Sequence, residues 1–275
     1  MKIDIWTYML SPSYVRHLEG AGQRGPGAFL LTQRALYDID LRRSLVDAYP
    51  GYRQILAPIP APHVDPSLGQ PGLLDLVRRN NEEMAEVASR YPEQFAGWIA
   101  ATPLWDPDAA TEAAVRSVRE LGAVGVQLEE DAINLPLHEE RYEPLFAAME
   151  QLGAGIWLHP YRTPATSGSA PETAPFLLWQ VVGWPFDTTI TVCRLMFAGI
   201  YDRHPNLKLI AHHGGGLIPH LSARFELIPY AGKLDPTGRL EEQLERLEKP
   251  PSEYLKMLYV DSAMFGAEHP GGQIR

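Results

Sequence analysis

Short apolar runs alternate with longer segments of helical periodicity along the whole of this 275-residue chain. Seven runs are predicted as strands, at 2–6, 54–59, 96–102, 123–128, 154–158, 207–211 and 256–260. The segments with a helical period lie at 35–48, 72–90, 108–121, 139–152, 186–203 and 216–230. Such alternation is typical of βα units around a parallel sheet. We therefore expect an α/β fold, a (β/α)8 TIM barrel that lacks its last strand and helix in this chain, and a single domain over residues 1–275.

The composition excludes several classes of protein. The chain has 34 Asp and Glu against 24 Lys and Arg, and this acidic balance argues against a nucleic-acid partner, because phosphate binding depends on clustered basic side chains. A single cysteine, Cys193, cannot form an intrachain disulfide. No apolar run approaches the roughly 18 residues that a membrane span needs, and the chain starts with a charged strand instead of an apolar signal segment. These features predict a cytoplasmic enzyme with no membrane role.

Polar side chains follow three of the predicted strands at the point where each strand ends. His159 closes the run at 154–158, His212 and His213 close the run at 207–211, and Asp261 closes the last run. Alone, a histidine there can bond to a loop carbonyl and an aspartate can cap the next helix. In a barrel, however, the C-terminal ends of the strands converge on the face where active sites form. The three positions together predict one shared site.

Two segments resemble a known family. They are the stretch WQVVGWPFDTT at 179–189 and, after Gly199-Ile200-Tyr201, the stretch HPNLKLIAHHGGG at 204–216. Both are similar to the amidohydrolase-related group, and within it to the aminocarboxymuconate semialdehyde decarboxylase branch, with the resemblance densest between about 154 and 265. It implies a (β/α)8 barrel with one divalent metal ion, zinc or manganese. It also implies decarboxylation, hydration or hydrolysis of small aromatic or unsaturated acids.

The resemblance also implies roles for individual residues. His159 and Asp261 match metal ligands of the family, and His213 matches the catalytic histidine that activates a metal-bound water. His212 is then expected to occupy a neighbouring slot that faces the barrel wall. Arg224 matches an arginine that holds a substrate carboxylate, a task that suits the fixed donors of a guanidinium group.

The first strand departs from the family pattern. Family members usually have His-x-His there, whereas this chain has Trp6-Thr7-Tyr8. An indole nitrogen has no lone pair for a metal, and a phenol with a pKa near 10 is a poor ligand at neutral pH. Since a catalytic zinc usually keeps three protein ligands, this departure predicts a weakened metal site. Trp6 and Tyr8 either fill the barrel mouth with apolar area or form an aromatic floor that binds a flat substrate.

Three functional hypotheses follow from these residues. In the first, a carboxy-lyase with a weakened metal site decarboxylates a small carboxylic acid, using His213 for proton transfer and Arg224 as anchor. In the second, a hydrolase or hydratase uses His213 as general base without tightly bound metal, so its activity survives chelation. In the third, a non-catalytic barrel binds a small acid or a protein partner.

Two further expectations concern the periphery of the barrel. The segment Tyr161–Pro175, rich in Ser, Thr, Pro and Gly, follows His159 and is predicted to act as a lid. A seven-stranded barrel would leave unpaired edges at its first and last strands, and unpaired edges favour association. This leaves a homodimer open as the state of the protein.

Overall fold

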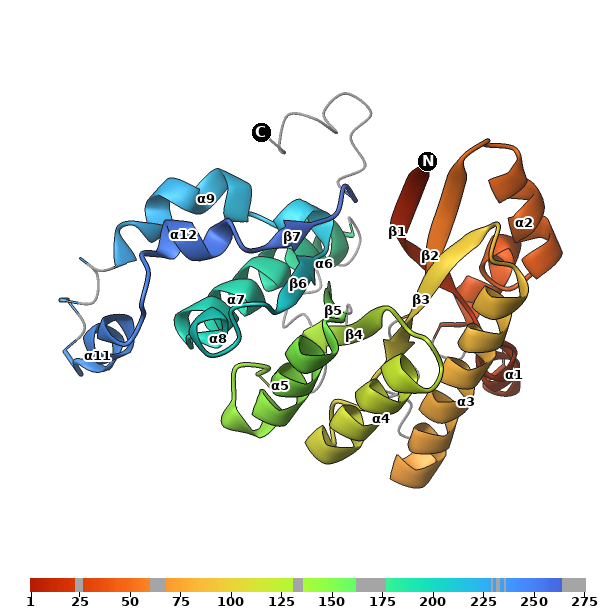
Figure 1. Ribbon diagram of the computed structural model, residues 1–275, viewed down its shortest axis with the longest axis horizontal. Helices are drawn as coiled ribbons and strands as arrows, with labels where there is room; N and C mark the ends of the chain where they lie inside the picture. The colour runs from red at the N-terminus through yellow and green to blue at the C-terminus, as the bar shows by residue number, and fades with distance from the viewer. Residues whose placement is uncertain are drawn as a thin grey trace. The chain divides into compact units, whose positions relative to one another are not determined.

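The computed structural model describes residues 1–22, 27–59, 68–130, 136–161, 177–228, 230, 233–234 and 236–263. The chain divides into two compact units, Met1–Leu128 and Glu129–Arg275 (Figure 1). The expectation of a single domain over 1–275 stays a prediction. The expected lid after Tyr161 lies outside the described residues from position 162 onward.

The first unit contains strands β1 (Lys2–Met9), β2 (Tyr52–Pro58), β3 (Phe95–Ala101) and β4 (Gly125–Glu130). Each strand pairs in parallel with the next one along the chain. The register between β1 and β2 shifts between Asp4 and Thr7. Trp6 therefore lies inside an irregular part of β1, where the usual period of two no longer predicts which face a side chain occupies.

Three helices of the first unit begin at a capping side chain. The helices and turns of this unit are α1 (Pro12–Gly20), the 3-10 turns η1 (Ala28–Thr32) and η2 (Arg34–Leu36), α2 (Ile39–Asp47), α3 (Gly69–Arg90) and α4 (Pro107–Arg119). Ser11, Asp38 and Asp106 each accept a hydrogen bond from a backbone N–H of the first turn of the helix that follows. Helix α3 packs against β3 (Figure 1), and its buried residues include Leu73, Val77 and Met84.

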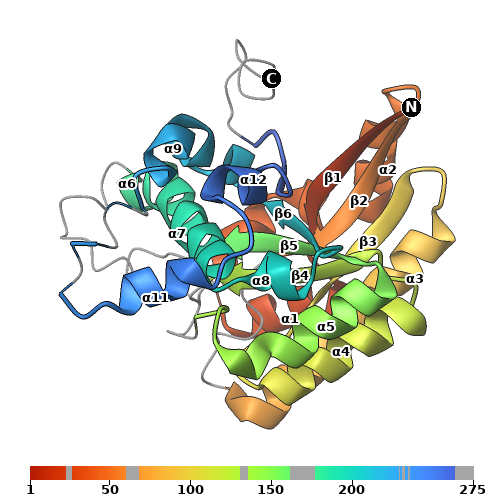
Figure 2. The same cartoon turned by 60° about the vertical axis from the view of Figure 1, so that its left-hand side comes forward.

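The second unit contains strands β5 (Gly155–Pro160), β6 (Lys208–Ala211) and β7 (Tyr259–Val260), paired in parallel in chain order (Figure 1). Figure 2 shows β5 and β6 side by side. Its helices are η5 (Glu140–Tyr142), α5 (Glu143–Leu152), α6 (Leu178–Val181), α7 (Gly183–Phe197), α8 (Ile200–Arg203), η7 (His213–Gly215), α9 (Ile218–Phe225), α11 (Arg239–Glu245) and α12 (Pro251–Leu255). Helix α7 packs against both β5 and η7.

All seven predicted strands overlap a strand of the structure, and each of the six predicted helical segments overlaps one or more helices. The sequence pattern did not predict α1, α6, α11 or α12, of which α1 is the longest at nine residues. No helix within the described ranges has the length and apolar character to cross a bilayer.

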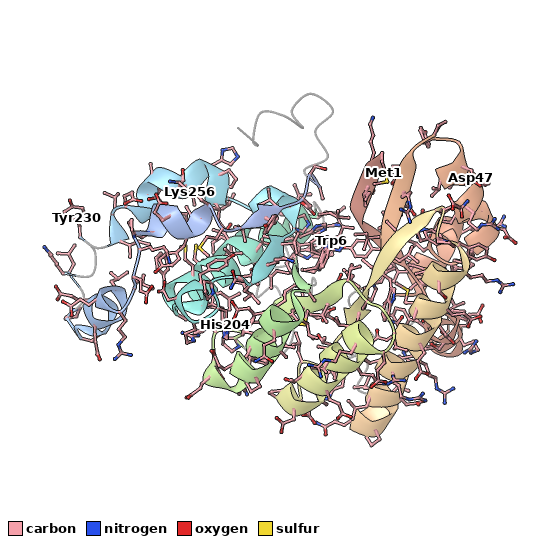
Figure 3. The ribbon with its side chains drawn as sticks, viewed as in Figure 1. Met1, Trp6, Asp47, His204, Tyr230 and Lys256 are labelled. Carbon is pink, nitrogen blue, oxygen red and sulfur yellow. The ribbon has the colours of Figure 1, made fainter. Side chains whose placement is uncertain are left out.

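A buried histidine, His204, joins α5 to the start of β6 in the second unit (Figure 3). Its Nδ1 lies 3.1 Å from Glu150 Oε2 and its Nε2 lies 2.7 Å from Glu143 Oε1. Arg203 donates from Nε to Glu143, and the Asn206 N–H donates to Glu150 at 2.8 Å. Burial acts to raise the pKa of Glu143, but the hydrogen bonds from Arg203 and His204 outweigh it and lower that pKa. The Asn206 N–H chiefly lowers the pKa of Glu150.

We expect His204→Ala to lower the free energy of unfolding by about 1–3 kcal/mol, because it leaves two carboxylates facing each other without the donors between them. Chemical denaturation followed by circular dichroism measures this change. Arg246→Ala, which removes an exposed ion pair to Glu242, is the control and should change stability by less than about 0.5 kcal/mol. Equal effects of the two substitutions would contradict a stabilising role for His204.

Candidate active site

The register of strands β5, β6 and β7 brings three polar residues to one level. Leu158 pairs with Ala211, and Ala211 pairs with Val260. The residues that follow these three positions are His159, His212 and Asp261. The ladder continues through them, because the His212 N–H donates to the Leu158 carbonyl at 3.2 Å and the Asp261 N–H donates to the Ala211 carbonyl at 3.3 Å. It is therefore His212, and not His213, that is in register with the other two.

The carboxylate of Asp261 is held by three donors. His212 Nδ1 forms a short hydrogen bond with Asp261 Oδ2. The backbone N–H groups of Gly214 and Ala263 donate to Oδ1 at 2.8 and 3.1 Å. The expectation that His212 faces the barrel wall is wrong, since the hydrogen bond to Asp261 turns its ring toward the carboxylate.

Three imidazole rings gather beside this carboxylate. The ring centroid of His212 lies 4.9 Å from that of His159 and 4.1 Å from that of His213. The centroids of His159 and His213 are 6.0 Å apart. His159, His212, His213 and Asp261 are 3%, 6%, 6% and 8% exposed. The structure thus brings together the three strand-end positions that the sequence predicted as one site.

His213 reaches the cluster through an unusual backbone conformation. Its φ of 54° begins four consecutive residues with positive φ, of which the other three are glycines. A side chain in this region is uncommon and is strained unless its surroundings hold it there. Its Nδ1 is buried and has no hydrogen-bond partner among the residues that the structure describes.

Burial sets the protonation of the cluster. It lowers the pKa of His159 well below the ordinary value, and the neighbouring charges of His212 and His213 lower it further. Burial also lowers the pKa of His213 to about 3, with a contribution from His212 and an opposing one from Asp261. Burial acts to raise the pKa of Asp261, but the hydrogen bond and charge of His212 and the two N–H groups outweigh it, so that this pKa is lowered. The cluster therefore combines an ionised carboxylate with neutral imidazoles at His159 and His213.

Two tryptophans border the imidazoles on one side. The ring centroid of Trp184, in the first turn of α7, lies 5.6 Å from that of His159 and 5.6 Å from that of His213. Trp179 of α6 packs edge-on against Trp184 at 5.5 Å. Both lie in the segment that carries the family resemblance, although the sequence alone assigned neither to the site.

The remaining predicted site residues are Arg224 of the second unit and Trp6 and Tyr8 of the first, and their roles stay predictions. Arg224 is in the last turn of α9 with its side chain exposed, and no contact joins it to the imidazoles among the described residues. Trp6 is 8% exposed in the first unit, where its Nε1 donates to Gln127 Oε1 at 3.3 Å (Figure 3). Tyr8 packs against the buried cluster of that unit, which includes Leu10 and Tyr14.

Comparison with known proteins identifies the family. The family model Amidohydro_2, described as Amidohydrolase, matches residues 74–270. The chain belongs to this amidohydrolase family. The matched residues include the whole of the imidazole and carboxylate cluster, and the resemblance predicted from the sequence is confirmed.

Curated relatives of this amidohydrolase are decarboxylases. The chain is 34% identical over 204 residues to the gamma-resorcylate decarboxylase of Rhodococcus jostii (strain RHA1), covering 70% of this chain and 61% of that protein. It is 31% identical over 153 residues to the 2-amino-3-carboxymuconate-6-semialdehyde decarboxylase of Dictyostelium discoideum, covering 56% of this chain and 41% of that protein. The amidohydrolase chain thus spans about three fifths or less of the length of these two relatives.

Solved structures confirm the fold class. A 2,6-dihydroxybenzoate decarboxylase in complex with 2,6-dihydroxybenzoate matches with a TM-score of 0.76 and 28% identity, over 94% of this chain and 79% of that one. A 5-carboxyvanillate decarboxylase of Novosphingobium aromaticivorans DSM 12444, complexed with manganese and a nitrobenzoic acid, matches with a TM-score of 0.80 and 23% identity, over 96% and 79% of the two chains. The predicted TIM-barrel type of α/β fold is therefore confirmed.

The described residues of this amidohydrolase do not complete a metal site. The imidazoles of His159 and His212 and the carboxylate of Asp261 are groups of the kind that bind zinc or manganese. However, both Asp261 oxygens already accept hydrogen bonds, and no group of three or more His, Cys, Asp or Glu side chains within the described ranges is arranged to hold an ion. Trp6 offers no lone pair, since its indole nitrogen is a donor only and is bonded to Gln127.

We expect Trp6→Phe to lower the stability of the amidohydrolase by about 1–3 kcal/mol, because Gln127 Oε1 loses its buried donor. Thermal unfolding and KM, measured on the same preparations, separate the two interpretations of this residue. If Trp6 is instead a substrate floor, KM rises while the unfolding temperature stays constant. In the double variant with Gln127→Leu, removal of both partners should cost less than the sum of the single changes.

Proposed function

We propose that this amidohydrolase is a carboxy-lyase that decarboxylates a small aromatic or unsaturated carboxylic acid without oxidation. The main support is the hydrogen-bonded pair of His212 and Asp261 in register with His159 on adjacent strand ends. Similarity to curated gamma-resorcylate decarboxylases supports the same class of reaction. On this proposal the chain is an enzyme whose partner is a small carboxylic acid.

Decarboxylation needs a proton donor at the carbon that loses its carboxylate. The bond between that carbon and the carboxylate breaks, CO2 leaves, and the electron pair that remains on the carbon takes up a proton. An imidazolium is suited to this step near neutral pH. Asp261 holds His212 at Nδ1, and a carboxylate in this position fixes the orientation of the ring and leaves Nε2 free of that bond. We therefore assign delivery of the proton to His212 Nε2.

The sequence proposed His213 for proton transfer, and that assignment fits the alternative reaction better. With a pKa of about 3, His213 is neutral at pH 7 and has no proton to give to a carbanion. A neutral imidazole can act as a general base for the addition of water. His213 thus stays the proposed base of the alternative function, a hydrolase or hydratase without tightly bound metal.

Substrate and metal binding extend the proposal. We propose Arg224 as the anchor for the substrate carboxylate and Trp6 and Tyr8 as aromatic contacts, as the family resemblance and residue chemistry suggest. We also propose that a divalent ion, zinc or manganese, is held weakly through His159 and Asp261. Support comes from solved relatives that contain manganese. A cytoplasmic location and a homodimer stay predictions.

We expect His212→Asn to reduce kcat for decarboxylation of 2,6-dihydroxybenzoate by about 100-fold or more, because the proton donor is lost. His213→Asn should reduce kcat by less than about tenfold. Release of CO2 and loss of substrate absorbance give the two rates. A larger loss in the His213 variant than in the His212 variant would return the assignment to His213, and hydrolysis of esters or lactones without decarboxylation would favour the alternative function.

We expect the purified protein to hold less than one equivalent of zinc or manganese after dialysis against a chelator, because the described ligand set is incomplete. Elemental mass spectrometry before and after dialysis measures the metal content. His159→Ala is the matched variant, and it should lower the content before dialysis. Retention of one full equivalent after prolonged chelation would show that the site is stronger than we propose.

A further inference from the structure

A single hydroxyl group joins helix α7 to the loop that follows the histidine pair. Thr189 is 5% exposed and lies in the second turn of α7. Its Oγ1 donates to the Pro185 carbonyl at 2.7 Å and accepts from the Leu217 N–H at 2.7 Å. Leu217 is the residue that precedes α9, directly after the glycines of the loop. Thr189 therefore connects two segments that are separated by 28 residues in sequence.

The backbone of the loop lies directly on the start of α7 at Gly216. Its φ is +65°, and a Cβ at this position would collide with the Pro185 carbonyl oxygen and lie 2.6 Å from Thr189 Oγ1. No side chain fits between the two segments here. The distance between the loop and the helix is consequently set by backbone contact together with the Thr189 hydroxyl.

Both joined segments carry residues of the site. Pro185 directly follows Trp184, whose ring packs against those of His159 and His213. The loop begins with His212 and His213, and its Gly214 donates to Asp261. A shift of the loop against α7 would therefore move Trp184 relative to the imidazoles and would change the hydrogen bonds of Asp261.

A general helix-stabilising role explains only half of this arrangement. Threonines inside helices often bond to the carbonyl four residues earlier, and the bond to Pro185 is of this kind. The second bond, from the Leu217 N–H, is not part of α7 and joins that helix to the end of the loop at the start of α9. The neighbouring Thr188 provides a contrast, because its buried Oγ1 has no hydrogen-bond partner among the described residues.

We propose that Thr189 is a positioning residue that holds the histidine loop and Trp184 in fixed relation, so that the His212 and Asp261 pair meets the substrate in a productive geometry. Its effect on catalysis rests on the proposed carboxy-lyase function. Its effect on the geometry of the histidines does not, because Thr189 acts through the loop and not through the substrate.

The test compares two isosteric substitutions at adjacent buried positions. Thr189→Val removes the hydroxyl that joins the segments, and Thr188→Val removes one without a partner. Histidine side-chain NMR spectra of [15N]histidine-labelled protein report the ring environments, with signals assigned through His212→Asn and His213→Asn. We expect Thr189→Val to shift the His212 and His213 signals and to lower kcat for 2,6-dihydroxybenzoate by about 10- to 100-fold. Thr188→Val should change neither the histidine signals nor kcat. Thr189→Ser, which keeps the hydroxyl, should leave both at their wild-type values.

The outcomes separate this inference from the proposed function. Unchanged histidine signals and unchanged kcat in Thr189→Val would overturn the inference. Shifted signals in a protein whose wild type decarboxylates none of the tested acids would leave the positioning role intact and reject the carboxy-lyase function. If Thr189→Val does not fold, Thr189→Ala, which adds no bulk, serves in its place. Equal effects of the Thr188 and Thr189 substitutions would show general loosening of α7 and would also overturn the inference.

Discussion

The parallel register of β5, β6 and β7 is the constraint on which the site depends. Pairing of Leu158 with Ala211 and of Ala211 with Val260 brings the next residue of each strand, His159, His212 and Asp261, to one level. A slip of one residue would bring His213 to that level and would turn each β6 side chain to the other face of the sheet. Both faces of the runs Ile156–Leu158 and Leu209–Ala211 are buried, so such a slip would disrupt close packing on both sides of the strands.

An ionised carboxylate among buried aromatic rings is costly unless donors surround it. Asp261 meets this condition with one imidazole and two backbone N–H groups, on Gly214 and Ala263. These donors hold the pKa of the carboxyl below its ordinary value in spite of burial. Because the Gly214 N–H belongs to the loop with positive φ, the electrostatics of the site depend on that backbone conformation as well as on the strand register.

Much of this architecture could be predicted from the sequence, because strand runs and helical periods are local. Prediction was less successful where a single residue decides the outcome. The predicted helical segment 108–121 agrees with α4 to within two residues at each end, but the period did not identify Ala110 and Ala114 as its fully buried alanines. Helix α1 was missed although Ser11 and Pro12 form a typical start signal, because only nine residues follow it. The choice of His213 over His212 came from the family resemblance, and only the pairing of β6 with β5 and β7 shows that His212 is the one in register.

In the site of the second unit, the position of each side chain depends on contacts made by the others. Strand register places His212 beside Asp261. The chain then turns through four consecutive residues with positive φ, His213 to Gly216. That turn can lie on α7 only because Gly216 lacks a side chain, and this contact in turn fixes where Trp184 meets the imidazoles. Each contact joins two residues of Glu129–Arg275, the unit that also contains β5, β6 and β7. Trp6 and Tyr8 belong to Met1–Leu128, and neither side chain takes part in any of these contacts.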